Sequence, residues 1–309
     1  KFNIFHPKTL DFYSNKIRVC DLDLNQFNTE AEKYTTLKRS SLIKFLKDRL
    51  FSNVFRFNKT VKTVEHKESK IKINFTDGAA DEIDYLIVSD GVFSATKKII
   101  ENKKTQINFK GAFAARTIID KNNFKTFNKE NISLIMCPRA HIVLYPVNEN
   151  EYNFVATIRS KINTTADKNR KLLNKILEKN NLNISFDKDL AFWPIYSSNK
   201  PATSKYKNIF YLGDAFYAFP PTMAQGAVQS IESANELFKI LEKDNNDKKN
   251  LYYFNRLKRV ETVSKRSNFN FFAFHFSSQF FVYIRNFILK KLVCNKKFID
   301  SFLGRVFRK

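Results

Sequence analysis

The clearest pattern of apolar and polar residues runs from 208 to 241. It opens with an apolar run, Ile209-Phe210-Tyr211-Leu212, which has the length and bulk of a buried strand. Gly213-Asp214 ends the run, and a turn containing Pro220-Pro221 follows. From a start near Gln225, apolar residues then recur at helical spacing, at Val228, Ile231, Leu237, Phe238 and Leu241. The pattern predicts a strand, a rigid turn and a helix, which place Asp214 and a helix N-terminus at the carboxyl edge of an α/β sheet, where ligands bind.

A second strand and turn lie earlier in the chain. Apolar residues alternate with polar ones at Ile71, Ile73 and Phe75, and Thr76-Asp77-Gly78 supplies a turn, so a β-hairpin is predicted. The run Tyr85-Leu86-Ile87-Val88 is typical of a buried strand and leads into Ser89-Asp90-Gly91 and a helix start. Asp90 therefore repeats the arrangement of Asp214.

The other predicted elements frame these two. Ser40 and Ser41 are expected to cap a helix with an apolar face of Leu42, Phe45, Leu46 and Leu50. Residues 111–118 and 141–160 are predicted strands, the second region being a hairpin that turns at 148–150. Amphipathic spacing predicts a helix over 166–180 and a long helix from Leu251.

Composition narrows the class of protein. The 309 residues include 43% hydrophobic ones, enough for a substantial core in one large or two modest domains. The net charge is +24, but Lys is spread along the whole chain, which favours a general bias over a nucleic-acid-binding patch. The three Cys and four His are dispersed, so we predict reduced thiols in a cytosolic protein and no metal site. No apolar run is long enough to span a membrane.

The chemistry around Asp214 indicates a type of ligand. A helix N-terminus attracts an anion, or a group that becomes anionic, and a carboxylate accepts hydrogen bonds from hydroxyls. Flavin offers both partners, a ribityl chain and a ring edge that gains negative charge on reduction. The alternative is an ordinary connection between strand and helix in which Asp214 is an N-cap.

A family resemblance rests on the same residues. Gly213-Asp214-Ala215, Pro221, Gln225-Gly226, Glu232 and Ala234 together resemble the second FAD fingerprint of the single-component flavoprotein aromatic hydroxylases, and the salicylate-hydroxylase-like members most of all. Three positions depart from that pattern. Tyr217 stands where the family usually has His, Ala224 replaces a Gly, and Ser233 replaces an Asp.

Other segments resemble further motifs of this family. Asp90-Gly91, with Lys97 at the usual Arg position, is similar to a motif near the cofactor pyrophosphate, and Arg39 to the residue that reaches that pyrophosphate. Tyr145-Pro146 and Asn153-Phe154-Val155 resemble a hairpin of the substrate sheet. A loosened form of the family's C-terminal pattern appears at Arg256, Arg259-Val260, Ser264, Asn268, His275 and Arg285-Asn286.

The resemblance implies an activity and a set of site residues. It implies an FAD-dependent monooxygenase in which NADH or NADPH reduces the flavin and a flavin C4a-hydroperoxide hydroxylates a small phenol or carboxylated ring with molecular oxygen. The cofactor-binding candidates are Arg39, Asp90, Gly91, Gly213, Asp214, Pro221, Ala224, Gln225, Gly226 and Ala227. The substrate-pocket candidates are Arg116, His141, Tyr145 and Tyr217, each with a structural role as the alternative. No general base is predicted, because Tyr217 replaces the family's His.

The implied fold is α/β. We expect an FAD-binding domain of the Rossmann-like βαβ type, as in glutathione reductase, interleaved with a mixed β-sheet substrate domain and followed by a helical C-terminus. The expected segments are 1–100 and 201–245 for FAD, 101–200 for substrate and 246–309 for the helices. No strand with a GxGxxG turn is present, so the N-terminal βαβ unit is expected to be absent and the chain to be an N-terminally truncated fragment.

Two other classes stay open. A flavoprotein that hydroxylates or reduces a prenylated quinone precursor or an isoprenoid lipid would keep the FAD motifs and use the basic, Phe-rich C-terminus to contact a membrane. A remnant that no longer holds FAD is the non-enzymatic alternative. We expect no nucleic acid partner and a cytoplasmic location, with a membrane-peripheral location and a homodimer as alternatives.

Overall fold

The structure is a computed structural model that describes residues 4–300, except 31–32, 68, 104–105, 122–126, 183, 185, 187–189 and 244–246. It divides into two compact units, each assembled from separate stretches of the chain. Unit 1 comprises residues 1–51, 111–195 and 272–309, and unit 2 comprises residues 52–110 and 196–271. The expected division into four segments remains a prediction, and its boundary at 245 lies outside the described residues.

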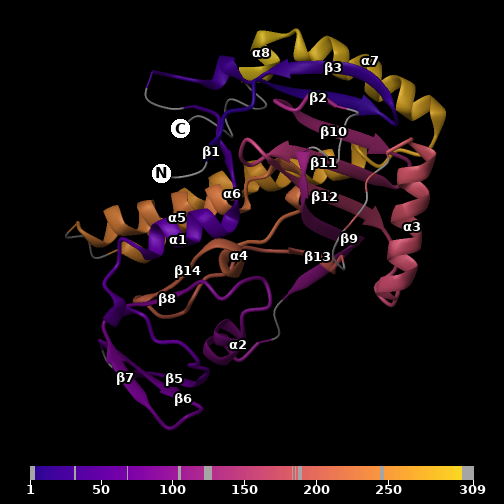
Figure 1. Ribbon diagram of the computed structural model, residues 1–309. Helices are drawn as coiled ribbons and strands as arrows, with labels where there is room; N and C mark the ends of the chain where they lie inside the picture. Colours follow the sequence, from indigo (N-terminus) through magenta and orange to yellow (C-terminus); the bar gives the residue numbers. More distant parts are fainter. Residues whose placement is uncertain are drawn as a thin grey trace. The chain divides into compact units, whose positions relative to one another are not determined.

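Unit 1 is built on a mixed seven-stranded sheet in the order β13-β9-β12-β11-β10-β2-β3 (Figure 1). β10 and β2 pair in parallel, whereas β2–β3, β10–β11, β11–β12 and β12–β9 are antiparallel. The strands are β2 (Thr9–Ser14), β3 (Ile17–Asp23), β9 (Ile107–Asp120), β10 (Ile132–Cys137), β11 (Ala140–Pro146), β12 (Glu151–Arg159) and β13 (Phe192–Ser198). The predicted hairpin over 141–160 is confirmed as β11 and β12.

The two faces of this sheet are covered differently. One face is packed by α3 (Ala166–Lys179), whose Leu173 and Leu177 join Leu144 and Phe154 in a buried cluster. On the other face a second cluster lies over β2, β3 and β10, and includes Phe274 and Ile299. α7 (Gln279–Val293) contacts β3, and α8 (Lys296–Ile299) follows it (Figure 1). Unit 1 also holds α1 (Arg39–Lys47), the 3-10 turn Asn25–Phe27 and the strand pair β1 (Ile4–Phe5) with β4 (Thr36–Leu37).

Unit 2 is built on a parallel strand pair, β8 (Leu86–Val88) and β14 (Ile209–Tyr211). Its second sheet has three antiparallel strands, β5 (Val61–Lys67), β6 (Lys70–Phe75) and β7 (Ala80–Ile83), and confirms the hairpin predicted around residues 76–78. The helices are α2 (Ala95–Glu101), α4 (Gly213–Phe216), α5 (Gly226–Leu241) and α6 (Lys248–Ala273), with short 3-10 turns at Ser52–Val54 and Pro221–Met223. The last two residues of α6 fall in unit 1.

The mixed α/β class with a helical C-terminal region is confirmed, but three local predictions were wrong. Lys38, not a serine, precedes the first turn of α1, and no residue of that helix is buried. In the predicted buried strand, Tyr85 and Ile87 are nearly half exposed. Periodicity shows which residues share a stripe, and it does not show whether another element covers that stripe.

The third difference concerns α5. Its predicted apolar face is largely exposed, with Val228, Ile231 and Phe238 between 41% and 59% accessible. The buried side chains are Gln229, Ser233, Leu237 and Ile240. α5 therefore buries a half-polar face, and its buried polar atoms are satisfied by hydrogen bonds.

Within the described residues, no helix is both long and apolar enough to cross a bilayer.

Candidate functional site

Parallel pairing of β8 and β14 brings the two predicted motifs to one sheet edge. Tyr211 lies opposite Val88, and the Leu212 amide donates to the Val88 carbonyl at 2.9 Å. Because the strands are parallel, their carboxyl ends coincide. Asp90 and Asp214, far apart in sequence, thus follow neighbouring strands at the edge where ligands of α/β proteins bind.

Gly213 makes the turn after β14. Its φ of +54° is a left-handed conformation, and a Cβ on this residue would lie 2.7 Å from Ser230 Oγ of α5. Both features require glycine. The tight turn leaves Asp214 exposed in the first turn of α4.

A buried lysine joins the two motifs. Lys97 Nζ donates to the Ala215 carbonyl at 2.8 Å, which links α2 to the turn after β14. Burial lowers the pKa of Lys97, and the charges of Asp90 and Glu101 partly oppose that effect. The sequence pointed to Lys97 as a substitute for a pyrophosphate-side Arg, whereas the structure uses it to hold the second motif against the first.

Asp90 has a local partner. Its Oδ2 accepts from the Thr96 amide at 3.1 Å, at the start of α2, and Ser94 Oγ accepts from the Lys97 amide at 2.9 Å. Burial raises the pKa of Asp90, but hydrogen bonds from Ser94 and Thr96 outweigh it, so the pKa lies below its ordinary value. Asp90 is therefore a stable carboxylate that shapes the turn at Gly91, whose φ is +88°.

The start of α5 is open. No side chain caps it, and Ala224, Gly226 and Ala227 are all exposed. A Cβ built on Gly226 meets no atom within 4 Å. The free amides of this first turn carry the positive end of a sixteen-residue helix dipole. Such amides favour an anionic group, and the space at Gly226 is open, so the residues present are compatible with the expected flavin.

The turn before α5 is fastened to α6. Thr222 Oγ1 donates to the Ser267 carbonyl at 2.7 Å, and Asn270 Nδ2 donates to Met223 Sδ at 2.9 Å. Pro221 begins the short 3-10 turn, which ends at Ala224 with a φ of +53°. Ala224 thus adopts a backbone conformation that favours the glycine it replaces.

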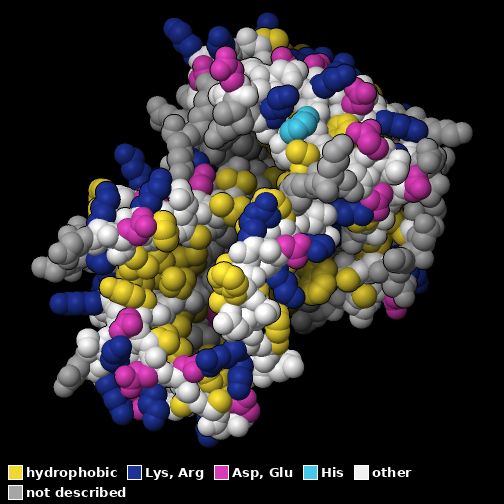
Figure 2. All heavy atoms as spheres, turned by 60° about the vertical axis from the view of Figure 1, so that its left-hand side comes forward, with side chains coloured by type: hydrophobic (Ala, Val, Ile, Leu, Met, Phe, Trp, Pro, Cys, Tyr) yellow, Lys and Arg dark blue, Asp and Glu magenta, His cyan; other side chains and the backbone are white. Residues whose placement is uncertain are grey.

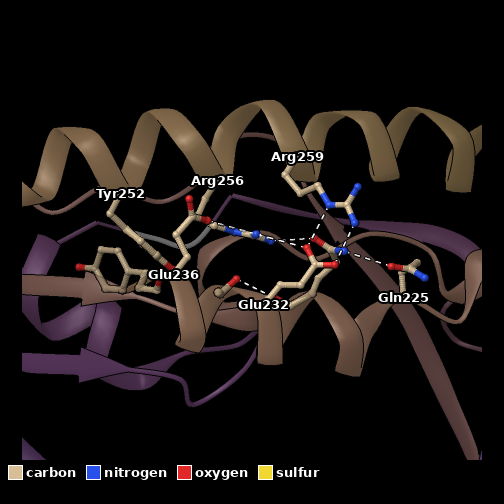
Figure 3. A network of polar contacts seen from close by, with 9 residues as sticks. Gln225, Glu232, Glu236, Tyr252, Arg256 and Arg259 are labelled. Carbon is tan, nitrogen blue, oxygen red and sulfur yellow. Dashed lines mark hydrogen bonds and ion pairs between the residues drawn. The ribbon is translucent and has the colours of Figure 1, made fainter. Parts of the chain in front are cut away.

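A polar network extends from this turn along α5 and α6 (Figure 3). Gln229 donates to Gln225 Oε1 at 3.0 Å, and its own Oε1 accepts from Arg256 Nη2 at 2.7 Å. Arg259 binds both carboxylate oxygens of Glu232, at 3.0 and 2.8 Å. Gln225 is 1% exposed, so the network fixes the residue that precedes the open amides.

The charged side chains of this network are paired, with Arg256 buried and the other three partly buried. Arg256 is 3% exposed, and its Nη1 lies 3.5 Å from Glu232 Oε2 and 3.4 Å from Glu236 Oε2. Burial raises the pKa of Glu232, but the hydrogen bond and charge of Arg259, with the charge of Arg256, lower it more. Sequence reasoning noted Arg256, Arg259 and Glu232 as motif positions and missed their mutual pairing. The available signal was the spacing: Glu232 and Glu236 fall on one acidic face of the first helix, and Arg256 and Arg259 fall on one basic face of the second.

Tyr217, the residue in place of the family's His, lies in unit 2. Its hydroxyl is 3.3 Å from Ser264 Oγ of α6, and its ring packs against an apolar cluster. Asn268 Nδ2 donates to the Ser264 carbonyl at 2.9 Å and so continues this link along α6. Tyr217 thus contacts the long helix.

The remaining pocket candidates lie in unit 1, on one face of its sheet. Arg116 pairs across strands with Val155, Tyr145 with Asn153, and His141 with Thr157, which places all three candidate side chains on the face opposite α3. Arg116 is exposed, and Tyr145 is partly buried. Burial raises the pKa of Tyr145, while Arg116 and Asn153 oppose that shift. The β9–β12–β11 part of this face is thus less covered near Arg116, whereas its other end, at His141 and Thr157, is buried.

His141 has a buried structural partner. Its Nδ1 lies 2.8 Å from His275 Nε2, and Arg159 Nε donates to His275 Nδ1 at 3.2 Å. Burial and the charge of Arg159 lower the pKa of His141 to about 3. These contacts favour the structural alternative for His141.

Arg39, the predicted pyrophosphate ligand, is the exposed first residue of α1 in unit 1.

Comparison with known proteins supplies a family. A sequence profile of the family described as FAD binding domain matches residues 6–251. A 3-hydroxybenzoate 6-hydroxylase from Aquipseudomonas alcaligenes is 25% identical over 221 residues, which cover 68% of each chain. A 6-hydroxynicotinate 3-monooxygenase from Bordetella bronchiseptica is 23% identical over 257 residues, which cover 77% of this chain and 66% of that protein. The chain thus spans about two thirds of the length of these curated relatives.

Solved structures show the same fold. The structure of Klebsiella pneumoniae HpxO with FAD and uric acid has a TM-score of 0.84 at 15% identity, covering 98% of this chain and 81% of that one. A salicylate hydroxylase substrate complex has a TM-score of 0.75 at 14% identity, covering 99% of this chain and 84% of that one. The fold expected from the sequence is thereby confirmed.

Proposed function

This chain belongs to the FAD binding domain family, and from that premise we propose that it is the FAD-holding and substrate-holding part of a monooxygenase that hydroxylates a small aromatic ring. The observation that carries the proposal is the parallel pair β8–β14, which brings Asp90, Asp214 and the open start of α5 into one unit. FAD, when bound, supplies the redox chemistry and oxygen activation that side chains lack.

The residues of unit 2 suit the parts of FAD. The exposed Asp214 carboxylate accepts hydrogen bonds from ribityl hydroxyls, and the uncapped amides after Gln225 donate to the ring edge that becomes negative on reduction. Gly91 and Gly226 leave open space beside the backbone. For Arg39, which belongs to unit 1, we propose that its guanidinium binds the pyrophosphate of FAD, because a guanidinium binds phosphate oxygens with two parallel hydrogen bonds. Pro221 and Ala224 set the turn that precedes these amides.

For the substrate we propose a ring that carries a carboxylate. The names of two relatives contain benzoate and nicotinate, which are carboxylated rings. Arg116 is an exposed cation on the less covered part of the sheet face, with Tyr145 two strands away on the same face. A guanidinium is suited to bind and orient a carboxylate there. The electron donor is NADH or NADPH.

The cofactor assignment is tested by flavin binding. The natural reading frame that contains these 309 residues is expressed, and FAD affinity is measured by quenching of flavin fluorescence. Asp214→Asn is expected to weaken FAD binding about ten- to hundredfold, since a hydrogen bond to a charged acceptor contributes about 1.5–3 kcal/mol. Asp167→Asn, an exposed carboxylate of α3, is the matched control. Equal affinity in the Asp214 variant, or no flavin binding by the parent, contradicts the assignment.

The activity is tested separately. Oxidation of NADH or NADPH is followed with a panel of carboxylated and uncarboxylated phenols, and products are checked by mass for one added oxygen. Arg116→Gln is expected to raise KM for carboxylated rings about tenfold or more and to leave KM for uncarboxylated rings unchanged. An equal effect on both classes would show that Arg116 does not bind the carboxylate.

A second candidate function is hydroxylation or reduction of an isoprenoid or prenylated quinone substrate held in a membrane. The observation that favours it is a large exposed aromatic surface on α7, where Phe280 and Tyr283 are 67% and 71% accessible. Turnover of a prenylated phenol in vesicles, compared with turnover of its soluble head group, distinguishes this function from hydroxylation of a small soluble ring.

We also propose a homodimer as an assembly of this chain, and sedimentation velocity tests it.

A further inference from the structure

α7 is apolar on two opposite sides. Leu289 and Val293 pack against the buried cluster over β2, β3 and β10. On the other side Phe280, Tyr283 and Phe287 follow at helical spacing and are 67%, 71% and 54% exposed. Exposed aromatic area is unfavourable in water, so a helix that packs one apolar side on the core seldom leaves a second row of aromatic rings uncovered. The outer side of α7 therefore has the composition of a surface that something covers.

The aromatic surface continues past the start of α7. Phe276 lies between Phe272 and Phe281, with ring centroids 4.9 and 5.6 Å away, and Phe280 lies 5.6 Å from Phe281. Phe272 and Phe281 are 62% and 52% exposed. We call the six residues Phe272, Phe276, Phe280, Phe281, Tyr283 and Phe287 the aromatic patch. A contiguous patch of this kind marks an interaction site, unlike apolar residues scattered singly.

The stretch of chain that carries the aromatic patch is basic. Residues 262–299 contain no Asp or Glu. Lys290, Lys291, Lys296 and Lys297 are all exposed, and Lys291 Nζ lies 5.9 Å from the centre of the Phe287 ring. Lysine stems lie along apolar surface while their ammonium groups stay in water. Lys291 thus lies on the same surface as the aromatic rings, and this stretch of the chain itself brings no acidic residue that would oppose an anion.

We propose that the aromatic patch and its lysines dock this protein on the surface of an anionic lipid bilayer. Phe and Tyr rings enter the boundary between head groups and acyl chains, and the lysines bind anionic head groups. A second copy of this chain is a poorer occupant, because it would bring the same cations together in a protein of net charge +24. Docking is peripheral, since no described helix could span the bilayer.

Vesicle binding tests this proposal. The purified protein is sedimented with vesicles of phosphatidylcholine alone and of phosphatidylcholine with phosphatidylserine. We expect binding only with phosphatidylserine, falling at high salt. The charge variant Lys290→Gln/Lys291→Gln is expected to bind about tenfold or more weakly. The ring variant Phe280→Ser/Phe287→Ser is expected to bind about tenfold more weakly even at low salt.

Matched controls separate the patch from net charge. Lys171→Gln/Lys175→Gln removes the same charge from exposed positions of α3, and Phe254→Ser removes a ring that is 69% exposed on α6. Both controls are expected to bind like the parent. Equal weakening by the α3 variant would overturn the proposal, since binding would then follow total charge. Absence of vesicle binding, with a dimer in sedimentation velocity that the ring variant dissociates, would assign the patch to a second copy instead.

Discussion

Gly213 and Ala224 stand in the same left-handed backbone region at the two ends of the turn between β14 and α5, with φ of +54° and +53°. At Gly213 the side-chain space is also taken, because Ser230 Oγ would lie 2.7 Å from an added Cβ. Ala224 adopts the conformation at a cost of about 1–2 kcal/mol. The sequence identified both as motif positions, but only the backbone angles show that the departure at Ala224 carries strain.

The two penalties at Gly213 can be separated by mutation. Gly213→Ala is expected to lower the free energy of unfolding by more than about 2 kcal/mol, as measured by urea denaturation. Adding Ser230→Ala removes the clashing hydroxyl, so the double variant should recover the steric part and keep a loss of about 1 kcal/mol from the φ angle. If Ser230→Ala restores nothing, the close contact with α5 does not limit this position.

His141 and His275 have defined tautomers. Because Arg159 Nε donates to His275 Nδ1, neutral His275 carries its proton on Nε2 and donates it to His141 Nδ1. Protonation of His141 would place two donors face to face in a buried site. This explains on geometric grounds why burial and Arg159 hold the pKa of His141 near 3.

This histidine pair predicts a pH dependence. In the folded protein His141 stays neutral down to about pH 3, whereas in the unfolded chain it gains a proton below about pH 6.5. Stability therefore falls as the pH falls through that window, by up to about 1.4 kcal/mol per pH unit. His141→Asn should reduce the slope of unfolding free energy against pH just below 6.5, while His6→Asn, at an exposed position, should leave it unchanged. The same slope in both variants would contradict this account.

Whole elements were predicted where a local pattern decides them. The hairpins of β6–β7 and β11–β12 and the helices α3, α5 and α6 all follow from periodicity and turn residues. The order of the seven strands does not, since β2 and β10 pair in parallel across more than a hundred intervening residues. The buried face of α5 was also missed, because Gln229 and Ser233 are polar and become buried only through partners on other elements.

The network between α5 and α6 should be important to stability. Glu232→Gln leaves the buried Arg256 and the partly buried Arg259 without that carboxylate, so we expect a loss of about 3 kcal/mol in urea denaturation at neutral pH. The pKa of Glu232 is lowered in the folded protein, so the stabilisation from its carboxylate is lost as the pH falls below the ordinary pKa of a glutamate. The unfolding free energies of parent and variant should therefore converge in acid. Glu261→Gln, exposed on α6, is the control and should cost little.

At the scale of the whole molecule, charge is the dominant feature. A net charge of +24 makes the compact protein repel itself, and the repulsion acts over a Debye length that shrinks from about 30 Å at 0.01 M salt to about 8 Å at 0.15 M. The ion pairs between α5 and α6 are largely buried and are therefore screened less. The sequence gives the net charge and already pointed to a basic, Phe-rich C-terminus, while the grouping of its exposed rings into one patch required the structure.

Salt should therefore stabilise the protein. Raising the salt concentration from about 0.01 M to about 0.15 M is expected to increase Tm, because screening weakens the repulsion more than it weakens the buried pairs. Sodium and potassium chloride should act alike in thermal unfolding followed by circular dichroism. A decrease in Tm with salt would mean that attractive surface pairs outweigh the repulsion.

The parallel pair β8–β14 also has a consequence for biosynthesis. A ribosome produces Asp90 long before it produces β14, and helix α5 comes later still. Since the groups that we propose to bind flavin come together only when both strands are present, a nascent chain cannot retain the cofactor there before helix α5 has been made. We therefore expect the prosthetic group to be acquired late in synthesis or after it.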